Sequence, residues 1–172
     1  MKRSVPIPFT ELLYVVVIGT AMTRIDKLAL TETTILLILA LVIIFDDYLL
    51  YHHTVERIPS TGKNEILIFW TDMMVLAAWY ALSLAAQASS VLFWLWAGIF
   101  FTTTSLWEIL FAHDSLRRRL LRHADLVPIV TSFALSLAAA FLHWPYFFCV
   151  GVFLVAFAWC RAPDWAELWR RR

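Results

Sequence analysis

Apolar residues gather into six long stretches along the chain, and polar residues are confined mainly to the connections between them. A helix rises about 1.5 Å per residue, so about 20 apolar residues in a row can cross the hydrocarbon core of a bilayer. The pattern therefore predicts an all-α, polytopic membrane bundle of about six transmembrane helices. The predicted spans are residues 9–23, 30–51, 66–86, 91–112, 126–142 and 146–160.

The composition favours the same class of protein. Hydrophobic residues make up 62% of the 172 residues, whereas soluble domains contain roughly 45–50%. A water-soluble fold of this length keeps a large fraction of its surface exposed and could not bury so many apolar side chains. We therefore expect the lipid bilayer to cover the remainder, with residues 1–160 forming one six-span transmembrane domain.

Lys and Arg in the connections predict the orientation, because these residues collect on the cytoplasmic side of a membrane. With the N-terminus inside, twelve of the fourteen Lys and Arg residues fall in cytoplasmic segments, and only Arg24 and Lys27 fall outside. Both termini are therefore predicted to be cytoplasmic, in a membrane of the bacterial inner (plasma) type. Arg117, Arg118 and Arg119 are predicted to contact lipid or a partner protein from that side.

Residues 161–172 form a basic and aromatic end of the chain. Pro163 stands where a helix could start, and Trp165, Trp169 and the terminal arginines follow it. Amphipathic segments rich in Trp and Arg lie at the interface of lipid and water. The segment is predicted to be a cytoplasmic interfacial tail that forms a short helix, with a frayed basic tail as the alternative.

The sequence also contains an internal repeat. Residues 81–86 recur identically at 134–139, and Asp72 falls on Asp125 at the same offset of 53 residues. At an offset of 61 residues, acids, histidines and arginines also coincide: Asp47 with Glu108, His52 with His113, and Arg57 with Arg118. The second and third spans thus correspond to the fourth and fifth as hairpins of the same orientation. This predicts a parallel repeat about an axis along the membrane normal.

Five carboxylates fall inside predicted spans, all in the half nearer the cytoplasm. This acidic layer consists of Glu11, Asp46, Asp47, Asp72 and Glu108, and a histidine rim of His52, His53 and His113 borders it. A charged side chain inside a bilayer costs about 2.5–3.5 kcal/mol on insertion scales, and such residues mark ion or proton pathways. The acidic layer therefore predicts a cation pathway. The alternative is that these acids pair with cytoplasmic arginines and have a structural role.

Helix geometry and motif spacing limit the chemistry of this layer. Successive residues turn by about 100°, so Asp47 and His52 point about 140° apart and cannot bind one ion from a single helix. The sequence has no His-Glu-x-x-His or paired Cys-x-x-Cys spacing, no signal for a nucleophile paired with a base, and no Gly-rich phosphate loop. It therefore predicts a non-enzymatic protein with no metal site, no cofactor and no nucleic-acid partner. The many aromatic residues leave a pigment or quinone carrier as a minor alternative.

The first half of the chain resembles a known family. The run that starts Phe9-Thr-Glu-Leu is similar to the first helix of the transmembrane-protein-175 type of potassium channel, which carries Phe-Ser-Asp-Gly before an apolar run. His52-His53 and Trp70-Thr-Asp72 resemble that family's His-containing second helix and Trp-x-Asn third helix. The resemblance covers roughly residues 8–86. It implies a six-span chain that assembles as a tetramer, with the first helix lining a pore.

The same comparison shows where the chain departs from the family. Thr10 and Glu11 replace Ser and Asp with residues of similar type, but Leu12 replaces the glycine, and no arginine precedes Phe9 at the usual distance. If the first helix lines a pore, helical spacing makes one stripe of Val15, Ile18 and Met22 its lining. Ordinary helix packing is the alternative for that stripe.

These patterns together predict a small oligomeric cation channel or proton-linked transport protein that uses the acidic layer to attract cations. The alternative is a non-catalytic structural or assembly subunit of a larger membrane complex, with or without an associated pigment. Either way, the expected partners are the lipid bilayer and further membrane subunits, which are copies of this chain or neighbours in a complex.

Overall fold

The computed structural model describes residues 15–20, 22–23, 31–55, 65–111 and 126–170, and this part of the chain contains helices and no strand. The long helices are α2 (Glu32–Val55), α3 (Glu65–Ala88), α4 (Ser90–Phe111), α6 (Leu126–Phe141) and α7 (Tyr146–Arg170). A short helical segment at residues 15–20 precedes them. The prediction of an all-α chain is confirmed.

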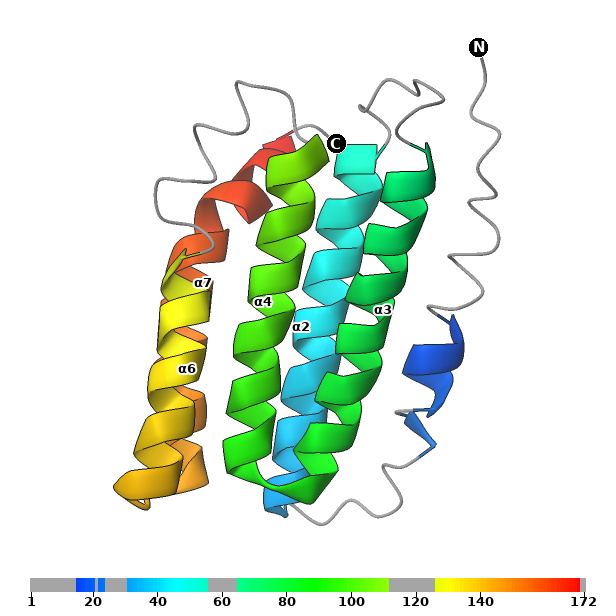
Figure 1. Ribbon diagram of the computed structural model, residues 1–172. Helices are drawn as coiled ribbons and strands as arrows, with labels where there is room; N and C mark the ends of the chain where they lie inside the picture. The colour runs from blue at the N-terminus through cyan, green and yellow to red at the C-terminus, as the bar shows by residue number, and fades with distance from the viewer. Residues whose placement is uncertain (1–14, 21, 24–30, 56–64, 112–125, 171–172) are drawn as a thin grey trace.

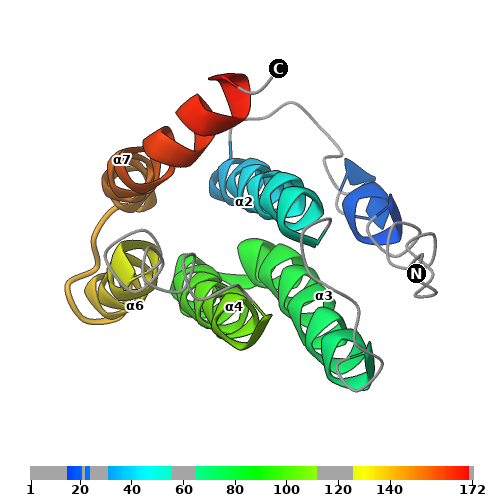
Figure 2. The same ribbon diagram turned by 90° about the horizontal axis from the view of Figure 1, so that it is seen from above.

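The long helices run alternately up and down and form two rows (Figure 1). Seen along the bundle, α6, α4 and α3 form one row, while α7, α2 and the short N-terminal segment form the other (Figure 2). α4 packs along both α3 and α6, whereas α2 contacts α7 at few points. Short connections enforce this antiparallel order: Ser89 alone joins α3 to α4.

Residues next to the helices explain where α2 and α4 begin and where the chain turns after α6. Ser89 precedes α4, where its Oγ accepts a hydrogen bond from the backbone N–H of Leu92 at 3.2 Å. Thr31 precedes α2 and binds the N–H of Thr34 in the same way. Such caps satisfy donors that a helix leaves unpaired at its start. His143 has a φ of 51°, a left-handed conformation that reverses the chain between α6 and α7.

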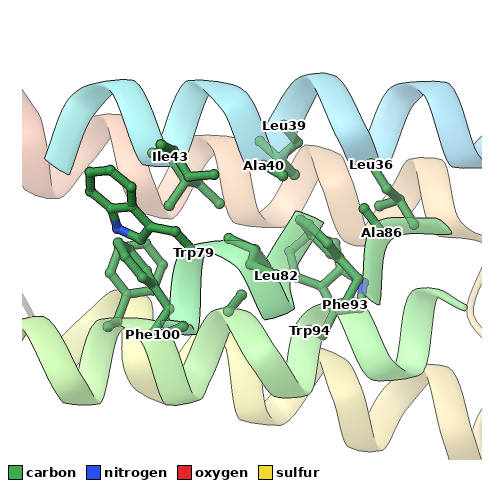
Figure 3. Close-up of a cluster of buried hydrophobic side chains, with 14 of the residues drawn as sticks. Leu36, Leu39, Ala40, Ile43, Trp79, Leu82, Ala86, Phe93, Trp94 and Phe100 are labelled. Atoms are coloured by element: carbon green, nitrogen blue, oxygen red, sulfur yellow. The ribbon is translucent and has the colours of Figure 1, made fainter. Parts of the chain in front are cut away.

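One apolar core fills the space between the two rows. Figure 3 shows side chains of α2, such as Ile43, facing Trp79 and Leu82 of α3 and Phe100 of α4. Aromatic rings extend this core to α7. Since this interior is occupied by rings and aliphatic side chains, the helices are held at fixed separations around it.

Within the part of the chain that the structure describes, two helical windows are long and apolar enough to cross a membrane, judged by length and composition. They are Phe69–Ala88 in α3 and Tyr146–Pro163 in α7. The apolar helical stretches Ser90–Leu106 and Leu126–Phe141 are shorter. By length and composition, α3 and α7 are compatible with association with a membrane.

The predicted spans from residue 30 onward coincide with the five long helices, but the C-terminal boundary was wrong. The sequence predicted that a new helix starts at Pro163, whereas α7 continues through Pro163 to Arg170. The frayed tail is also excluded as far as Arg170. A proline inside a helix removes one backbone hydrogen bond and bends the helix, and the last turns of α7, drawn red, turn away from its axis (Figure 1, Figure 2).

Candidate functional site: a buried polar cluster around α2

Asp46 lies buried where α2 meets α7, and both of its carboxylate oxygens bind α7. Oδ2 lies 3.1 Å from Nε of Arg161, and Oδ1 accepts a hydrogen bond from Nε1 of Trp165 at 2.7 Å. The two charged side chains are only 7% and 5% exposed, respectively. Removing charges from water is costly, so a buried carboxylate is stable only with such a counter-charge and further hydrogen bonds. We call Asp46, Arg161 and Trp165 the α2–α7 clasp.

Phe157 of α7 supports the clasp from one side. Its ring centroid lies 5.9 Å from Cζ of Arg161 and 6.2 Å from the ring of Trp165, in an edge-to-face arrangement. The ring itself is buried and stacks on Phe153 at 5.5 Å. A cation beside an aromatic face gains electrostatic attraction, so the guanidinium is held by a carboxylate and by a ring.

Asp47, the next residue on α2, faces a different neighbour. Its Oδ2 accepts a hydrogen bond from Nε1 of Trp79 on α3 at 3.1 Å, and Trp79 is fully buried. Consecutive helical residues point about 100° apart, so two adjacent acids can serve two different helices. Asp46 and Asp47 therefore fix α2 against α7 and α3, respectively.

Asp72 and Thr71 of α3 extend the polar interior toward one end of the bundle. Both residues are buried, and each has an interaction partner. Asp72 precedes Trp79 by seven residues, or about 10 Å of helix.

On α4, the hydroxyls of Thr102 and Thr103 donate to the carbonyls of Gly98 and Ile99 at 2.7 Å. These two hydroxyls bond within their own helix and do not need a ligand.

The clasp lies well inside the length of the bundle. Asp46 is about 21 Å along α2 from Glu32, and Arg161 is about 22 Å along α7 from Tyr146, at 1.5 Å per residue. Since both helices run in the same direction, the two charges lie at the same height. That height is nearer the end of the bundle where the C-terminus lies (Figure 1).

The structure separates the described members of the acidic layer. Asp46 binds Arg161, which is the structural alternative that the sequence left open, and Asp47 faces α3. In the described part of the chain, no group of three or more His, Cys, Asp or Glu residues could hold a metal ion. Outside the described residues lie Glu11, His113, Arg117, Arg118 and Arg119, and the side chains of His52, His53, Glu108 and Trp169.

The stripe predicted to line a pore has a mixed environment. Val15 and Met22 are 67% and 58% exposed, whereas Ile18 packs against the core. A single face of the N-terminal segment thus carries both exposed and packed members. A pore lining remains a prediction for this stripe.

Two residues of the cluster were not predicted from the sequence. These two are Arg161 and Trp79, while Trp165 was predicted to lie in the interfacial tail. Trp165 is 37% exposed and turns its indole N–H to Asp46. One signal could have found the pair, because Arg161 and Trp165 are four residues apart and share a helix face.

The predicted repeat remains a prediction as well. The matching serines Ser83 and Ser136 lie near the same end of the bundle, on α3 and α6. Ser83 donates its hydroxyl to the carbonyl of Trp79 in its own helix. Ser136 instead donates to the carbonyl of Val91 on α4 at 3.1 Å. Corresponding residues therefore make different contacts.

Comparison of the chain with protein families, with curated proteins and with solved structures finds no match.

Proposed function

We propose that this chain is a polytopic integral membrane protein that serves as a non-catalytic structural subunit of a membrane complex. The supporting observation is the distribution of polarity across the bundle. Trp159 on the outside of α7 is 82% exposed, and large apolar side chains are exposed on every long helix. The charged residues Asp46, Asp72 and Arg161 are buried.

This distribution is opposite to that of a soluble protein. Soluble monomers rarely expose apolar patches larger than a few hundred Å², and they seldom bury Asp or Arg. In a membrane, by contrast, ionisable side chains face the interior of the helix bundle and pair with one another. Lipid or a neighbouring subunit would cover the exposed rings and aliphatic groups.

The topology in this proposal has six spans with both termini in the cytoplasm. The five long helices supply five spans, and the predicted span at residues 9–23 supplies the first. The positive charges place the end of the bundle with the clasp toward the cytoplasm, in a membrane of the bacterial inner type. The parallel repeat of α2–α3 and α4–α6 belongs to the same proposal.

The contacts of the acids favour a structural role. Asp46 is neutralised by Arg161, and Asp47 accepts a hydrogen bond from a buried tryptophan. Beside the clasp, the interior is filled by rings: Phe101 lies 6.0 Å from Phe153 and 6.1 Å from Phe157. A conducting path needs polar groups along a water-filled route. Within a single chain, the described interior instead offers a packed apolar core.

A cation channel or proton-linked transport protein is the second candidate. One observation favours it: among the described residues two aspartates, Asp46 and Asp72, are buried and Asp47 is partly buried, but one arginine is buried. In that case the pathway would lie between copies of the chain, as the resemblance to tetrameric potassium channels implies. The exposed Val15 and Met22 would then be candidates for its lining.

Purification and reconstitution test the two candidates. The protein is isolated in mild detergent, its mass is measured, and cation and proton fluxes are recorded in liposomes of phosphatidylethanolamine and phosphatidylglycerol. The structural role predicts a constant ratio to another membrane protein and no flux above that of empty liposomes. A homo-oligomer whose flux is lost in Asp47→Asn and Asp72→Asn would overturn this role and support the channel.

A separate experiment tests the topology. Ser89 is exposed in the α3–α4 connection, so Ser89→Cys in intact cells should react with a maleimide that cannot cross membranes. Cys149 and Cys160 are buried, and the parent protein is therefore the unreactive control. Labelling of Ser89→Cys only after the cells are opened would contradict the proposed orientation.

A further inference from the structure

The α2–α7 clasp joins two parts of α7 that a proline separates. Arg161 precedes Pro163 by two residues, and Trp165 follows it by two. One carboxylate, that of Asp46, binds both side chains, with one oxygen for each. The clasp therefore spans the point at which α7 is weakest, since Pro163 cannot donate a backbone hydrogen bond to the preceding turn.

The direction of α7 changes in this region. The lower part of α7 stands parallel to the bundle, and the last turns, drawn red, lean toward the side of α2 (Figure 1, Figure 2). A proline allows a bend but leaves its direction to the surrounding contacts. Asp46 of α2 contacts residues on both sides of this bend, and it lies on the side toward which the segment leans.

We propose that Asp46 is a latch: by binding Arg161 and Trp165 on either side of Pro163, it sets the direction of the last turns of α7, and its release lets this segment swing. The latch depends on one ion pair and one hydrogen bond, and α2 and α7 otherwise approach each other at few points. Phe157, whose ring lies beside Arg161 and Trp165, is on α7 itself, so these ring contacts do not join α7 to α2. Opening the latch would therefore change the position of the C-terminal segment and leave the rest of the bundle in place.

Distances between spin labels can test the latch in the full chain in detergent or liposomes. One label is placed at the exposed Ala166 after the bend and one at the exposed Leu106 on α4. A second pair, at Leu95 and Leu137, reports on the α4–α6 contact and thus on the fold of the bundle. All samples carry Cys149→Ala and Cys160→Ala, so that only the introduced cysteines are labelled.

The variants separate the latch from a general loss of structure. Asp46→Asn and Trp165→Phe should shift or broaden the distance from 166 to 106 by about one helical turn, roughly 5 Å. The distance from 95 to 137 should not change. Asp47→Asn is the matched control, because this neighbouring acid accepts a hydrogen bond from Trp79 of α3, and it should leave both distances as they are.

A fourth variant tests the alternative that the proline alone sets the direction. Pro163→Ala restores the backbone donor, and the latch predicts an unchanged distance from 166 to 106, because an ion pair and a hydrogen bond to the same charged carboxylate outweigh one backbone bond. If Asp46→Asn also changes the distance from 95 to 137, the fold of the bundle has changed. Trp165→Phe is then the deciding test of the latch, since it removes one hydrogen-bond donor and no charge. Unchanged distances in Trp165→Phe, or a straightened segment in Pro163→Ala alone, would overturn the proposal.

Discussion

The contact of α4 with α6 and the contact of α2 with α7 are built in opposite ways. α4 and α6 meet along most of their length at close range: a Cβ added to Gly98 would lie 2.9 Å from the ring of Phe133. Among the described residues, the hydrogen bond from Ser136 to the carbonyl of Val91 accompanies this packing. α2 and α7 touch at few points, and the α2–α7 clasp joins them by one ion pair and one hydrogen bond.

If lipid covers the outer faces of the helices, as proposed, the difference shows two ways in which membrane helices can associate. Apolar contact between helices gains little over contact with lipid, so close packing must be extensive to be stabilising. A buried ion pair concentrates its effect in two side chains, and removal of one leaves the other charged and unpaired. We therefore expect the α4–α6 contact to tolerate single changes and the α2–α7 contact to be sensitive to them.

The largest effect is expected from Asp46→Ala. This change leaves the buried guanidinium of Arg161 without its carboxylate, which lowers the free energy of unfolding by about 3–5 kcal/mol. Unfolding by SDS in mixed detergent micelles, followed by tryptophan fluorescence, measures the change. A loss below that of any single change at the α4–α6 contact would contradict the comparison.

A double variant distinguishes a missing partner from a missing contact. Asp46→Leu combined with Arg161→Met removes both charges and fills the space with apolar groups. Replacing both members of a buried ion pair in this way is often neutral or stabilising. The double variant should therefore recover most of the loss seen in Asp46→Ala. Equal instability of the two would mean that the shape of the site matters more than its charge.

The sequence predicted the α4–α6 side of the molecule better than the α2–α7 side. A long apolar run is a local signal, and it located α4 and α6 to within a few residues. Asp46 pairs with Arg161 and Trp165, and the hydrogen bond from Trp165 joins residues that are 119 positions apart in the sequence. No local pattern states which helices become neighbours, so this pairing could be found only in the folded chain.

The end of α7 illustrates the same limit. Proline favours the first turn of a helix, since its missing N–H costs nothing there, and the sequence therefore predicted a helix start at Pro163. In the folded chain, side chains on both sides of Pro163 bind one carboxylate of α2. This tertiary contact outweighs the local preference and supports a continuous, bent helix.

Gly98→Ala should have the next largest effect, and it tests the close packing of α4 on α6. The added methyl group would overlap the ring of Phe133, and overpacking of this kind costs about 1–3 kcal/mol. Gly151→Ala on α7 is the matched control, because nothing lies within 4 Å of its added Cβ. That change should be neutral or stabilising in the same SDS titration, since Ala favours helix more than Gly does. Equal losses in both would exclude close approach as the reason for glycine at position 98.

Trp165→Phe tests one bond of the clasp without removing a charge. The ring remains available for Phe157, and the hydrogen bond to Asp46 is lost. Because Trp165 is partly exposed, we expect a decrease of about 1–2 kcal/mol, at the lower end for a bond to a charged group. Unfolding is followed by the helical circular dichroism signal, and Trp159→Phe on the exposed face of α7 serves as the control. A similar loss in both variants would show that ring size, and not the bond, is responsible.

The smallest effect is expected at the polar bond within the apolar α4–α6 contact. Ser136→Ala removes the hydroxyl that donates to Val91, and interhelical hydrogen bonds of this kind in membrane proteins average about 0.6 kcal/mol. Ser132, one turn earlier on α6, is fully buried, and its Oγ has no hydrogen-bond partner among the described residues. Ser132→Ala should therefore be neutral or slightly stabilising, because it removes an unsatisfied buried hydroxyl. If Ser136→Ala cost as much as Trp165→Phe, the α4–α6 contact would also depend on a directed bond, and the contrast between the two contacts would fail.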